Sequence, residues 1–402
     1  MTDVLFVVTH LHGIGHLRRT AVLARACSAR GLAVGIVSGG RPLRDLVLGP
    51  ARLFQLEPWL RSRDESFREL LGPHDAPLDE RLREKRCRQL LAILTRERPR
   101  ILVTEHFPFG RGKLRFELSP LVESARQMTP RPWIVSSVRD LLVEKPPEKT
   151  VWMAEAAEAY DRILVHGDEK LIPFAASFAQ TAALAGKLVY TGYVAETTAS
   201  ARPGRQHQSL QKAEEPQKEV LVSAGGGAFG RDFLFAALKS RPLSQAKDRP
   251  WRFLVGDNLP DADFQALRRQ AGGCVQVQRA EPDFPERLAS CALSISQGGY
   301  NTVVDLLRAG CPAVIVPYQE GGQSEQRRRA DLLDAGGWLT SAPGGDSDPA
   351  LLAAAIDRRL RAAAHPTAST RQAVRTALPN LNGSEVTAEI LADLAAIVPP
   401  GI

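Results

Sequence analysis

The sequence predicts an α/β protein made of two doubly wound, parallel-sheet domains. Short β-rich runs alternate with helical stretches along most of the chain, which is typical of parallel sheets covered on both faces. A polar segment without apolar periodicity, residues 196–218, interrupts this alternation, which then restarts. We therefore expect one Rossmann-like domain over residues 1–195, a linker, a second such domain over 219–375, and a C-terminal helix within 376–402 that could cross back to the first domain.

The expected strands fall into two series with helices between them. The helical stretches include Thr20–Ala29 and Met153–Tyr160 in the first half, and Glu385–Ile397 near the end. The first series of strands is Val4–Thr9, Ala33–Ser38, Arg52–Leu56, Ile101–Glu105, Trp133–Val138, Arg162–His166 and Leu188–Thr191. The second is Glu219–Ser223, Trp251–Val255, Val275–Arg279, Ala292–Ser296, Ala313–Val316 and Trp338–Thr340.

The composition is that of an ordinary globular protein, with 44% apolar and 24% charged residues. The five cysteines are scattered without zinc or redox spacing, so we expect reduced thiols in a cytoplasmic protein. The apolar run after Met1 is too short for a signal peptide, and the chain contains no apolar run of the roughly 18 residues that a membrane span requires.

The net charge of +7 is concentrated in places. Residues 81–100 hold eight Arg or Lys against two Glu, and Arg327–Arg329 is a second cluster. These basic patches could favour peripheral contact with an anionic membrane surface, or an anionic substrate, but a solvated helix face is the simpler interpretation. Nucleic acid is not an expected partner, because no basic tract is interleaved with aromatic residues.

The most informative segment follows the expected strand Ala292–Ser296. Gln297, Gly298 and Gly299 lead into a helix with Asn301 and Thr302 in its first turn and Asp305 one turn later. The amides at a helix start attract phosphate, and a carboxylate one turn further suits a ribose diol. A second glycine cluster, Gly225, Gly226 and Gly227, follows the strand that opens the second half. Both turns would lie at the carboxyl ends of strands in one sheet.

Ser294–Gly336 resembles the donor-site signature of the inverting GT-B glycosyltransferases, the superfamily of MurG-like enzymes and UDP-glycosyltransferases. Gln297 to Asp305 matches that family's motif at most positions, and Gly310, Pro312 and Pro317 follow at its spacing. The glycine-rich opening from Thr9 to Arg19 is similar to a bacterial group of predicted glycosyltransferases. The resemblance implies a GT-B fold with two domains facing a cleft, and transfer of a sugar from a UDP-sugar such as UDP-GlcNAc or UDP-glucose.

The resemblance also implies donor-binding roles. Asp305 would bind the ribose, and Glu325 and Gln326 would bind the sugar. The diphosphate would be held by Asn301, Thr302 and the amides of Gly298 and Gly299, with Gly225, Gly226 and Gly227 on its other side. Gln297 is a further donor-binding candidate. Gln297 replaces a frequent histidine and so removes a positive charge. Retaining relatives carry two glutamates where this chain has Gln297 and Asp305, so the absent first carboxylate favours inversion.

Inversion by direct displacement needs a general base, and His16 is the best candidate. It lies where the first strand gives way to the first helix, and the helix N-terminus keeps an imidazole neutral. His10 and His12 are rivals, and all three could instead be structural residues of the turn. Asp140 is a candidate for the carboxylate that orients the base.

The acceptor site should come from loops of the first half. Thr104–Arg111 is the most unusual of these loops. The candidate contacts with the acceptor are His12, Glu105, His106 and Arg111. Arg139, His166 and Asp168 are lesser candidates. A packed loop with a cationic rim is an equally good interpretation.

No cofactor or metal is expected. Asp261 and Asp263 copy the Asp-x-Asp of another transferase architecture, but helix capping and first-turn charge explain them better. The partners are therefore a nucleotide-sugar donor and an acceptor, either a small molecule or a glycan precursor. A nucleotide-sugar epimerase on the same fold and a non-catalytic nucleotide-sugar sensor are the alternatives.

Overall fold

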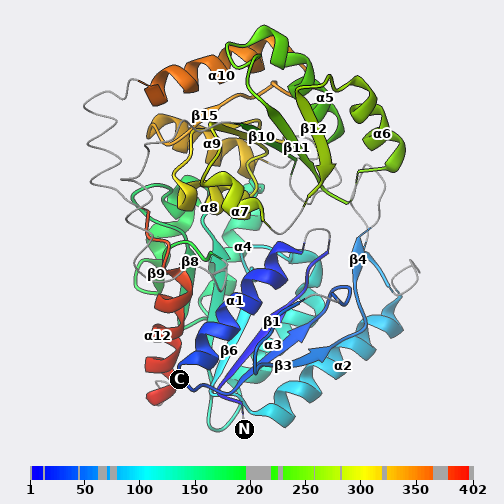
Figure 1. Cartoon of the computed structure of the whole chain (residues 1–402). Helices are drawn as coiled ribbons and strands as arrows, with labels where there is room; N and C mark the ends of the chain where they lie inside the picture. Colours follow the sequence, from blue (N-terminus) through cyan, green and yellow to red (C-terminus); the bar gives the residue numbers. More distant parts are fainter. Residues whose placement is uncertain are drawn as a thin grey trace. The chain divides into compact units, whose positions relative to one another are not determined.

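The structure is a computed structural model in which two compact units are distinguished (Figure 1). Unit 1 comprises Met1–Glu196 and Asn380–Ile402, and unit 2 comprises Thr197–Pro379. The residues that the structure describes are 2–11, 14–43, 46–61, 70–72, 79–195, 219–224, 230–257, 259–280, 283–318, 324–364 and 379–397. The chain therefore leaves unit 1, forms unit 2 and returns to unit 1 for its last helix.

Unit 1 contains a sheet of seven parallel strands among its described residues, in the order β3-β2-β1-β6-β7-β8-β9. The order reverses between β1 and β6, and in open α/β sheets such a reversal creates a crevice at the carboxyl ends of the strands. The strands are β1 (Val4–Val8), β2 (Val34–Ser38), β3 (Arg52–Gln55), β6 (Ile101–Glu105), β7 (Trp133–Arg139), β8 (Arg162–His166) and β9 (Leu188–Tyr190).

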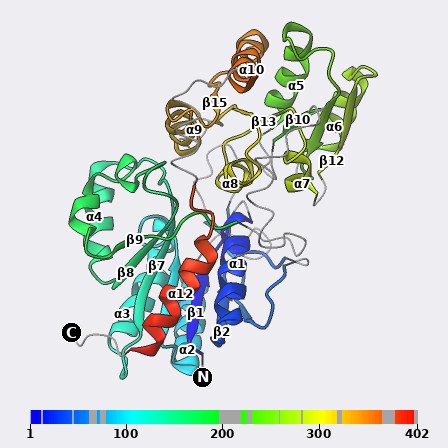
Figure 2. The same ribbon diagram turned by 60° about the vertical axis from the view of Figure 1, so that its left-hand side comes forward.

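Helices cover both faces of this sheet. On one face α1 (Gly15–Ala29) and α12 (Gly383–Ala396) lie side by side, and Figure 2 shows α12 in red next to α1 in blue. Successive side chains of a strand point to opposite faces of the sheet. Those on the other face pack against α2 (Glu80–Glu97) and α3 (Arg115–Arg126). Three further helices lie near β8: α4 (Pro147–Ala157), η3 (Phe174–Ala176) and η4 (Ala179–Leu184).

Unit 2 contains a second parallel sheet, of six strands among its described residues, in the order β12-β11-β10-β13-β14-β15. Its order reverses between β10 and β13. The strands are β10 (Val220–Ser223), β11 (Trp251–Val255), β12 (Val275–Arg279), β13 (Leu293–Ser296), β14 (Ala313–Ile315) and β15 (Thr340–Ser341). The helices are α5 (Arg231–Ser240), α6 (Asp261–Gln270), α7 (Phe284–Leu288), α8 (Tyr300–Ala309), α9 (Glu325–Ala335) and α10 (Pro349–Ala364), with the short η5 (Arg241–Leu243).

The predicted α/β class and parallel strands are confirmed, with element ends that differ by one or two residues in most cases. Two short strands were not predicted, the antiparallel pair of β4 (Leu60–Arg61) and β5 (Leu70–Leu71). Two-residue strands carry too little periodicity to be recognised in a sequence.

The basic cluster of residues 81–100 lies largely on α2, and its most buried member faces inward. Arg86 is 1% exposed and forms an ion pair with Glu117 of α3, at 2.9 Å from Nε to Oε2. Its Nη1 donates to the carbonyl of Gly39, and its guanidinium lies 4.6 Å from the ring of Trp59. The interpretation of the whole cluster as a solvated face is therefore wrong for Arg86.

Candidate active site

In unit 1 the candidate base lies on the first turn of α1. His16 is the second residue of that helix and is 7% exposed. Arg19 follows three residues later, so both side chains leave the same face of the helix. That face is directed at the carboxyl end of β6, where Glu105 is the last strand residue.

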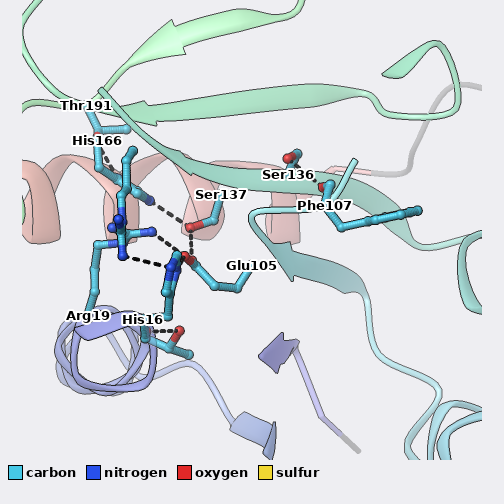
Figure 3. A network of polar contacts seen from close by, with 10 residues as sticks. His16, Arg19, Glu105, Phe107, Ser136, Ser137, His166 and Thr191 are labelled. Atoms are coloured by element: carbon cyan, nitrogen blue, oxygen red, sulfur yellow. Dashed lines mark hydrogen bonds and ion pairs between the residues drawn. The ribbon is translucent and has the colours of Figure 1, made fainter. Parts of the chain in front are cut away.

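Glu105 connects three neighbouring elements through one buried carboxylate, which is 2% exposed (Figure 3). Its Oε1 lies 2.7 Å from Nδ1 of His16 and also forms an ion pair with Arg19. Its Oε2 accepts a hydrogen bond of 2.7 Å from Oγ of Ser137 on β7. The carboxylate is held from both sides, so the imidazole of His16 is oriented by a fixed partner.

The contacts of His16 determine its tautomer. An ionised carboxylate only accepts hydrogen bonds, so Nδ1 of His16 carries the proton. Nε2 then has a lone pair, which accepts a hydrogen bond of 2.7 Å from Nη2 of Arg139. Burial, followed by the positive charge of Arg139, holds the pKa of His16 well below its usual value of 6.5. The ring is therefore neutral, and Nε2 is the nitrogen that can receive a proton.

The polar network continues away from His16 (Figure 3). Because the hydroxyl proton of Ser137 goes to Glu105, the Ser137 oxygen accepts from Nε2 of His166, at 2.9 Å. Nδ1 of His166 then accepts from Oγ1 of Thr191, at 2.8 Å. Burial holds the pKa of His166 well below its usual value, so its ring is neutral too. Every proton in this chain of hydrogen bonds points toward Glu105.

The loop after β6 brings a second histidine to the same place. His106 has φ 67°, in the left-handed region, and Gly110 lets the His106 ring lie against its backbone, where a Cβ would come within 2.1 Å of Cδ2. The His106 ring lies 5.2 Å from the His16 ring, centroid to centroid. Its Nδ1 is buried and has no hydrogen-bond partner among the described residues.

The two phenylalanines of this loop point into the core rather than toward an acceptor. Phe107 is 2% exposed and Phe109 is 1% exposed. The ring of Phe109 packs edge-on against Phe174 and Phe178, at centroid distances of 5.5 and 5.3 Å. They anchor the loop, and its polar residues remain to face the site.

Cations dominate the electrostatics of this site. Burial and then the charge of Arg111 lower the pKa of His10 to about 4. Burial and then Arg111 and Arg139 hold the pKa of His106 well below its usual value. Burial is the largest cause of the lowered pKa of His10, His16 and His106, and the charge of Arg111 adds to it at all three, so the rings are neutral.

The structure corrects two expected roles. Both ring nitrogens of His16 have other partners, so Asp140 is not its orienting carboxylate. Asp140 is fully buried and accepts from the amide of Leu141. The carboxylate that contacts His16 is instead Glu105, expected at the acceptor, which also contacts Arg19 and Ser137. His12 lies outside the described residues.

Sequence reasoning did not single out Arg19, Ser137 or Thr191 for the site. A weak signal existed for two of them. Arg19 is three residues from His16 on one helix, and Ser137 is two residues from Arg139 on one strand, so each pair shares a face. Thr191 offers no comparable signal, because it joins the site only through the packing of the last strand.

In unit 2 the expected donor segment follows β13. Ser223 of β10 pairs with Ser296 of β13 in parallel register, so the chain leaves the sheet from adjacent positions after these two residues. After β10 the chain continues into residues 225–229, which lie outside the described residues. These include Gly225, Gly226 and Gly227. After β13 the chain continues through Gln297 to α8.

The start of α8 has the features of a phosphate-binding helix N-terminus. Gly299 is its N-cap and has no side chain that could occupy the first-turn amides, and no acidic residue lies in that turn. Asn301 is exposed and Thr302 half-buried within it, while Asp305 lies one turn later. Gly310 ends the helix with φ 64°, in the left-handed region.

The turn before α8 is held from below by α9. A Cβ on Gly298 would lie 2.9 Å from Cγ2 of Ile315 and 3.2 Å from the carbonyl oxygen of Gln326, so only glycine fits. Arg329, which is fully buried, donates from Nη1 to the carbonyl of Gly298 at 3.0 Å. This member of the second basic cluster is thus part of the turn's support rather than of the surface.

The expected sugar contacts begin α9. Glu325 and Gln326 are its first two residues and are both half-buried. Oε1 of Gln326 accepts from the backbone amide of Tyr318 at 3.2 Å, which ties α9 to the segment after β14. Their contact with a donor sugar stays a prediction.

Other expected features have simple structural outcomes. Asp263 pairs with Arg231 at 2.9 Å, and Asp261 pairs with Arg279. Both lie in the first turn of α6, but neither caps it, since the N-cap is Pro260. All five cysteines are free thiols. Within the described ranges, we find neither a helix fit to span a membrane nor a group of three or more candidate metal ligands.

Solved structures of low sequence identity share this fold. CalG4, the calicheamicin glycosyltransferase, matches over 98% of both chains with a TM-score of 0.63 and 16% identity. MurG of Acinetobacter baumannii matches over 99% of this chain and 100% of its own, with a TM-score of 0.59 and 15% identity. The protein therefore has the GT-B glycosyltransferase fold.

Comparison of the sequence with known families and proteins gives two partial matches within this class of glycosyltransferases. Residues 224–382 match the glycosyltransferase family 28 C-terminal domain. The UDP-N-acetylglucosamine–N-acetylmuramyl-(pentapeptide) pyrophosphoryl-undecaprenol N-acetylglucosamine transferase of Paramagnetospirillum magneticum is 30% identical over 217 residues. That match covers 52% of this chain and 55% of the relative, so the similarity spans about half the relative's length.

Proposed function

We propose that the protein is an inverting, metal-independent glycosyltransferase that moves a sugar from a UDP-sugar to a hydroxyl of a small molecule or glycan precursor. The family 28 domain supports a nucleotide-sugar donor, and the relative's printed name supports UDP as the carrier. Unit 2 would bind the donor, and unit 1 would supply the base and the acceptor site.

The observation that carries the proposal is the neutral His16 held by Glu105. Nε2 of His16 would take the proton of the acceptor hydroxyl while the acceptor oxygen forms its bond to the anomeric carbon. The bond from that carbon to the UDP oxygen breaks, and UDP leaves with the electron pair. Glu105 would stabilise the imidazolium that forms, since its oxygen lies 2.7 Å from Nδ1.

The donor assignment follows from the geometry of α8 and the family match. The first-turn amides and the side chains of Asn301 and Thr302 would hold the diphosphate, and Asp305 would hold the ribose. Charge develops on the leaving UDP, and a helix N-terminus stabilises such charge without a metal. Glu325 and Gln326 would bind the transferred sugar.

A thermal-shift screen of UDP, TDP and GDP sugars tests the donor first. A ligand at 100 times its dissociation constant adds about 2.7 kcal/mol of stability. With the best donor, His16→Ala should abolish transfer to a panel of acceptors and leave UDP affinity unchanged. Epimer formation without acceptor would indicate the epimerase, and binding without turnover would indicate the sensor.

The cellular setting belongs to the same proposal. We place the enzyme in the cytoplasm, where nucleotide sugars are available, with peripheral membrane contact through those arginines of the basic patches that remain exposed. Co-sedimentation with anionic vesicles at low and high salt measures this contact, because surface attraction is screened by salt.

A further inference from the structure

The nitrogen that would act as the base is already engaged. Nε2 of His16 accepts a hydrogen bond from Nη2 of Arg139, and the two atoms are 2.7 Å apart. A lone pair directed at a guanidinium proton cannot at the same time take the proton of an acceptor hydroxyl. The proposed reaction therefore requires that Arg139 leaves Nε2 before transfer begins.

The surrounding groups indicate what would draw Arg139 away. After burial, the groups that lower the pKa of the neighbouring His106 ring are four cations: Arg111, Arg139, Arg19 and Lys145. Arg111 and Arg19 also act on His16. The carboxylate of this network, Glu105, is already shared by Arg19 and His16. A ligand oxyanion placed here would find several cations within range.

We propose that Arg139 masks the base in the free protein, and that a phosphate or carboxylate group on the acceptor releases it by binding the Arg139 guanidinium. This inference rests on the proposed function and names the class of acceptor as anionic. An arginine prefers an oxyanion to a neutral imidazole, because two parallel charge-assisted hydrogen bonds replace one to an uncharged nitrogen.

The position of Arg139 suits such a movement. It is the last residue of β7, where the backbone is fixed by the sheet, while its side chain is only half-buried. Release would free the Nε2 lone pair and remove a nearby positive charge that disfavours the imidazolium, so His16 would become a stronger base.

The mask has a consequence that can be measured without knowing the acceptor. Water could serve as the acceptor of the sugar if the base were open, so the mask suppresses hydrolysis of the donor. Arg139→Met should raise the release of UDP from the bound UDP-sugar, in the absence of acceptor, by at least about tenfold, which is ~1.4 kcal/mol of barrier. Arg139→Lys should give an intermediate rate, because a single ammonium masks less well.

Arg18→Met is the matched control. This substitution removes the same charge from α1, where the Arg18 side chain is exposed. The variant should hydrolyse the donor as slowly as the unmodified protein. A merely structural role of Arg139 predicts the opposite result for Arg139→Met, a rate that is unchanged or lower, and either result would overturn the mask.

Nitrogen NMR of the full-length protein labelled with 15N-histidine tests the mask without turnover. The Nε2 signal of His16, assigned by its loss in His16→Asn, should shift in Arg139→Met toward that of an imidazole nitrogen without a donor. Inorganic phosphate or acetate, added to the unmodified protein, should shift the signal the same way, and the more effective anion names the group on the acceptor.

These two measurements separate the inference from the proposed function. If neither the Met substitution nor either anion moves the Nε2 signal, Arg139 does not mask His16, whatever the enzyme does. If the signal moves as expected but no nucleotide sugar binds to any variant, the mask stands as a feature of an anion site and the transferase proposal fails.

Discussion

His16 and Glu105 are 89 residues apart in the sequence, yet Nδ1 of one lies 2.7 Å from Oε1 of the other. The pair joins the first helix to the central region of the sheet, at the point where the strand order reverses. Burial of both side chains makes their interaction strong, because little water screens it.

Glu105→Gln tests the orienting role of this carboxylate. An amide cannot stabilise an imidazolium, so we expect kcat to fall by about 10²- to 10⁴-fold, the range that general base catalysis supplies. Affinity for UDP should not change, because the proposed donor residues lie in unit 2. Transfer rates and UDP titrations measure the two effects, and Glu123→Gln, at an exposed position of α3, is the control. Unchanged kcat would contradict the assignment.

Arg329→Met tests the support of the turn before α8. Without the bond from Arg329 to the Gly298 carbonyl, the first-turn amides of α8 would be less well placed for a diphosphate. We expect UDP affinity to fall roughly tenfold, which is ~1.4 kcal/mol, while uridine affinity stays the same. Arg328→Met removes the same charge from an exposed neighbour and should change neither. Equal losses for UDP and uridine would show general disruption of the site instead.

Asp305→Asn tests the ribose contact. Hydrogen bonds to a charged carboxylate contribute about 1.5–3 kcal/mol, so UDP should bind roughly 10- to 100-fold more weakly to the variant. The 2′,3′-dideoxy analogue lacks both hydroxyls and should bind equally weakly to both proteins in calorimetric titrations. A variant that discriminates between UDP and the analogue as well as the unmodified protein does would exclude this role.

The buried histidines predict how stability depends on pH. The unfolded chain takes up protons on these residues near pH 6.5, while the folded pKa values of His16, His106 and His166 lie well below that value. The unfolded state therefore binds more protons below pH 6.5, so the free energy of unfolding decreases as the pH falls. Each such histidine contributes a slope of about 1.4 kcal/mol per pH unit in this range.

His166→Asn isolates one of these contributions. Asparagine can keep one hydrogen bond but does not titrate, so the slope of unfolding free energy between pH 6.5 and 5 should decrease by about 1.4 kcal/mol per pH unit. Urea titrations at several pH values measure it, with the m-value as the check that the folded state is retained. An unchanged slope would mean that His166 is protonated in the folded protein.

Glu117→Gln tests the buried end of the basic cluster on α2. It leaves the guanidinium of Arg86 without its carboxylate, and breaking a buried ion pair costs about 3–5 kcal/mol. Lys85 makes an exposed pair with Glu57, so Lys85→Met should cost no more than about 1 kcal/mol. Chemical denaturation measures both. Similar small losses would show that the Arg86 pair is not structural.

The sequence alone determined the class of fold, because hydrophobic periodicity is a local property. Four strands have the bounds that their sequence patterns predict: Ile101–Glu105, Arg162–His166, Trp251–Val255 and Val275–Arg279. The expected donor segment was equally local, since Gly298, Gly299 and Asp305 belong to one turn and the helix that follows it. His16 was predictable as the base candidate because its position after a glycine at a helix start is visible in the chain.

Only the tertiary structure decided which side chains meet. Asp140 and Glu105 are both acids near strand ends, and nothing in the sequence says which of them lies opposite α1. The strand order places β6 next to β1, so Glu105 contacts Nδ1 of His16. Arg139 at the end of β7 contacts the other ring nitrogen, Nε2. Burial likewise separates Arg86 and Arg329 from their exposed neighbours. Contacts between distant segments depend on packing, and packing is a property of the folded chain.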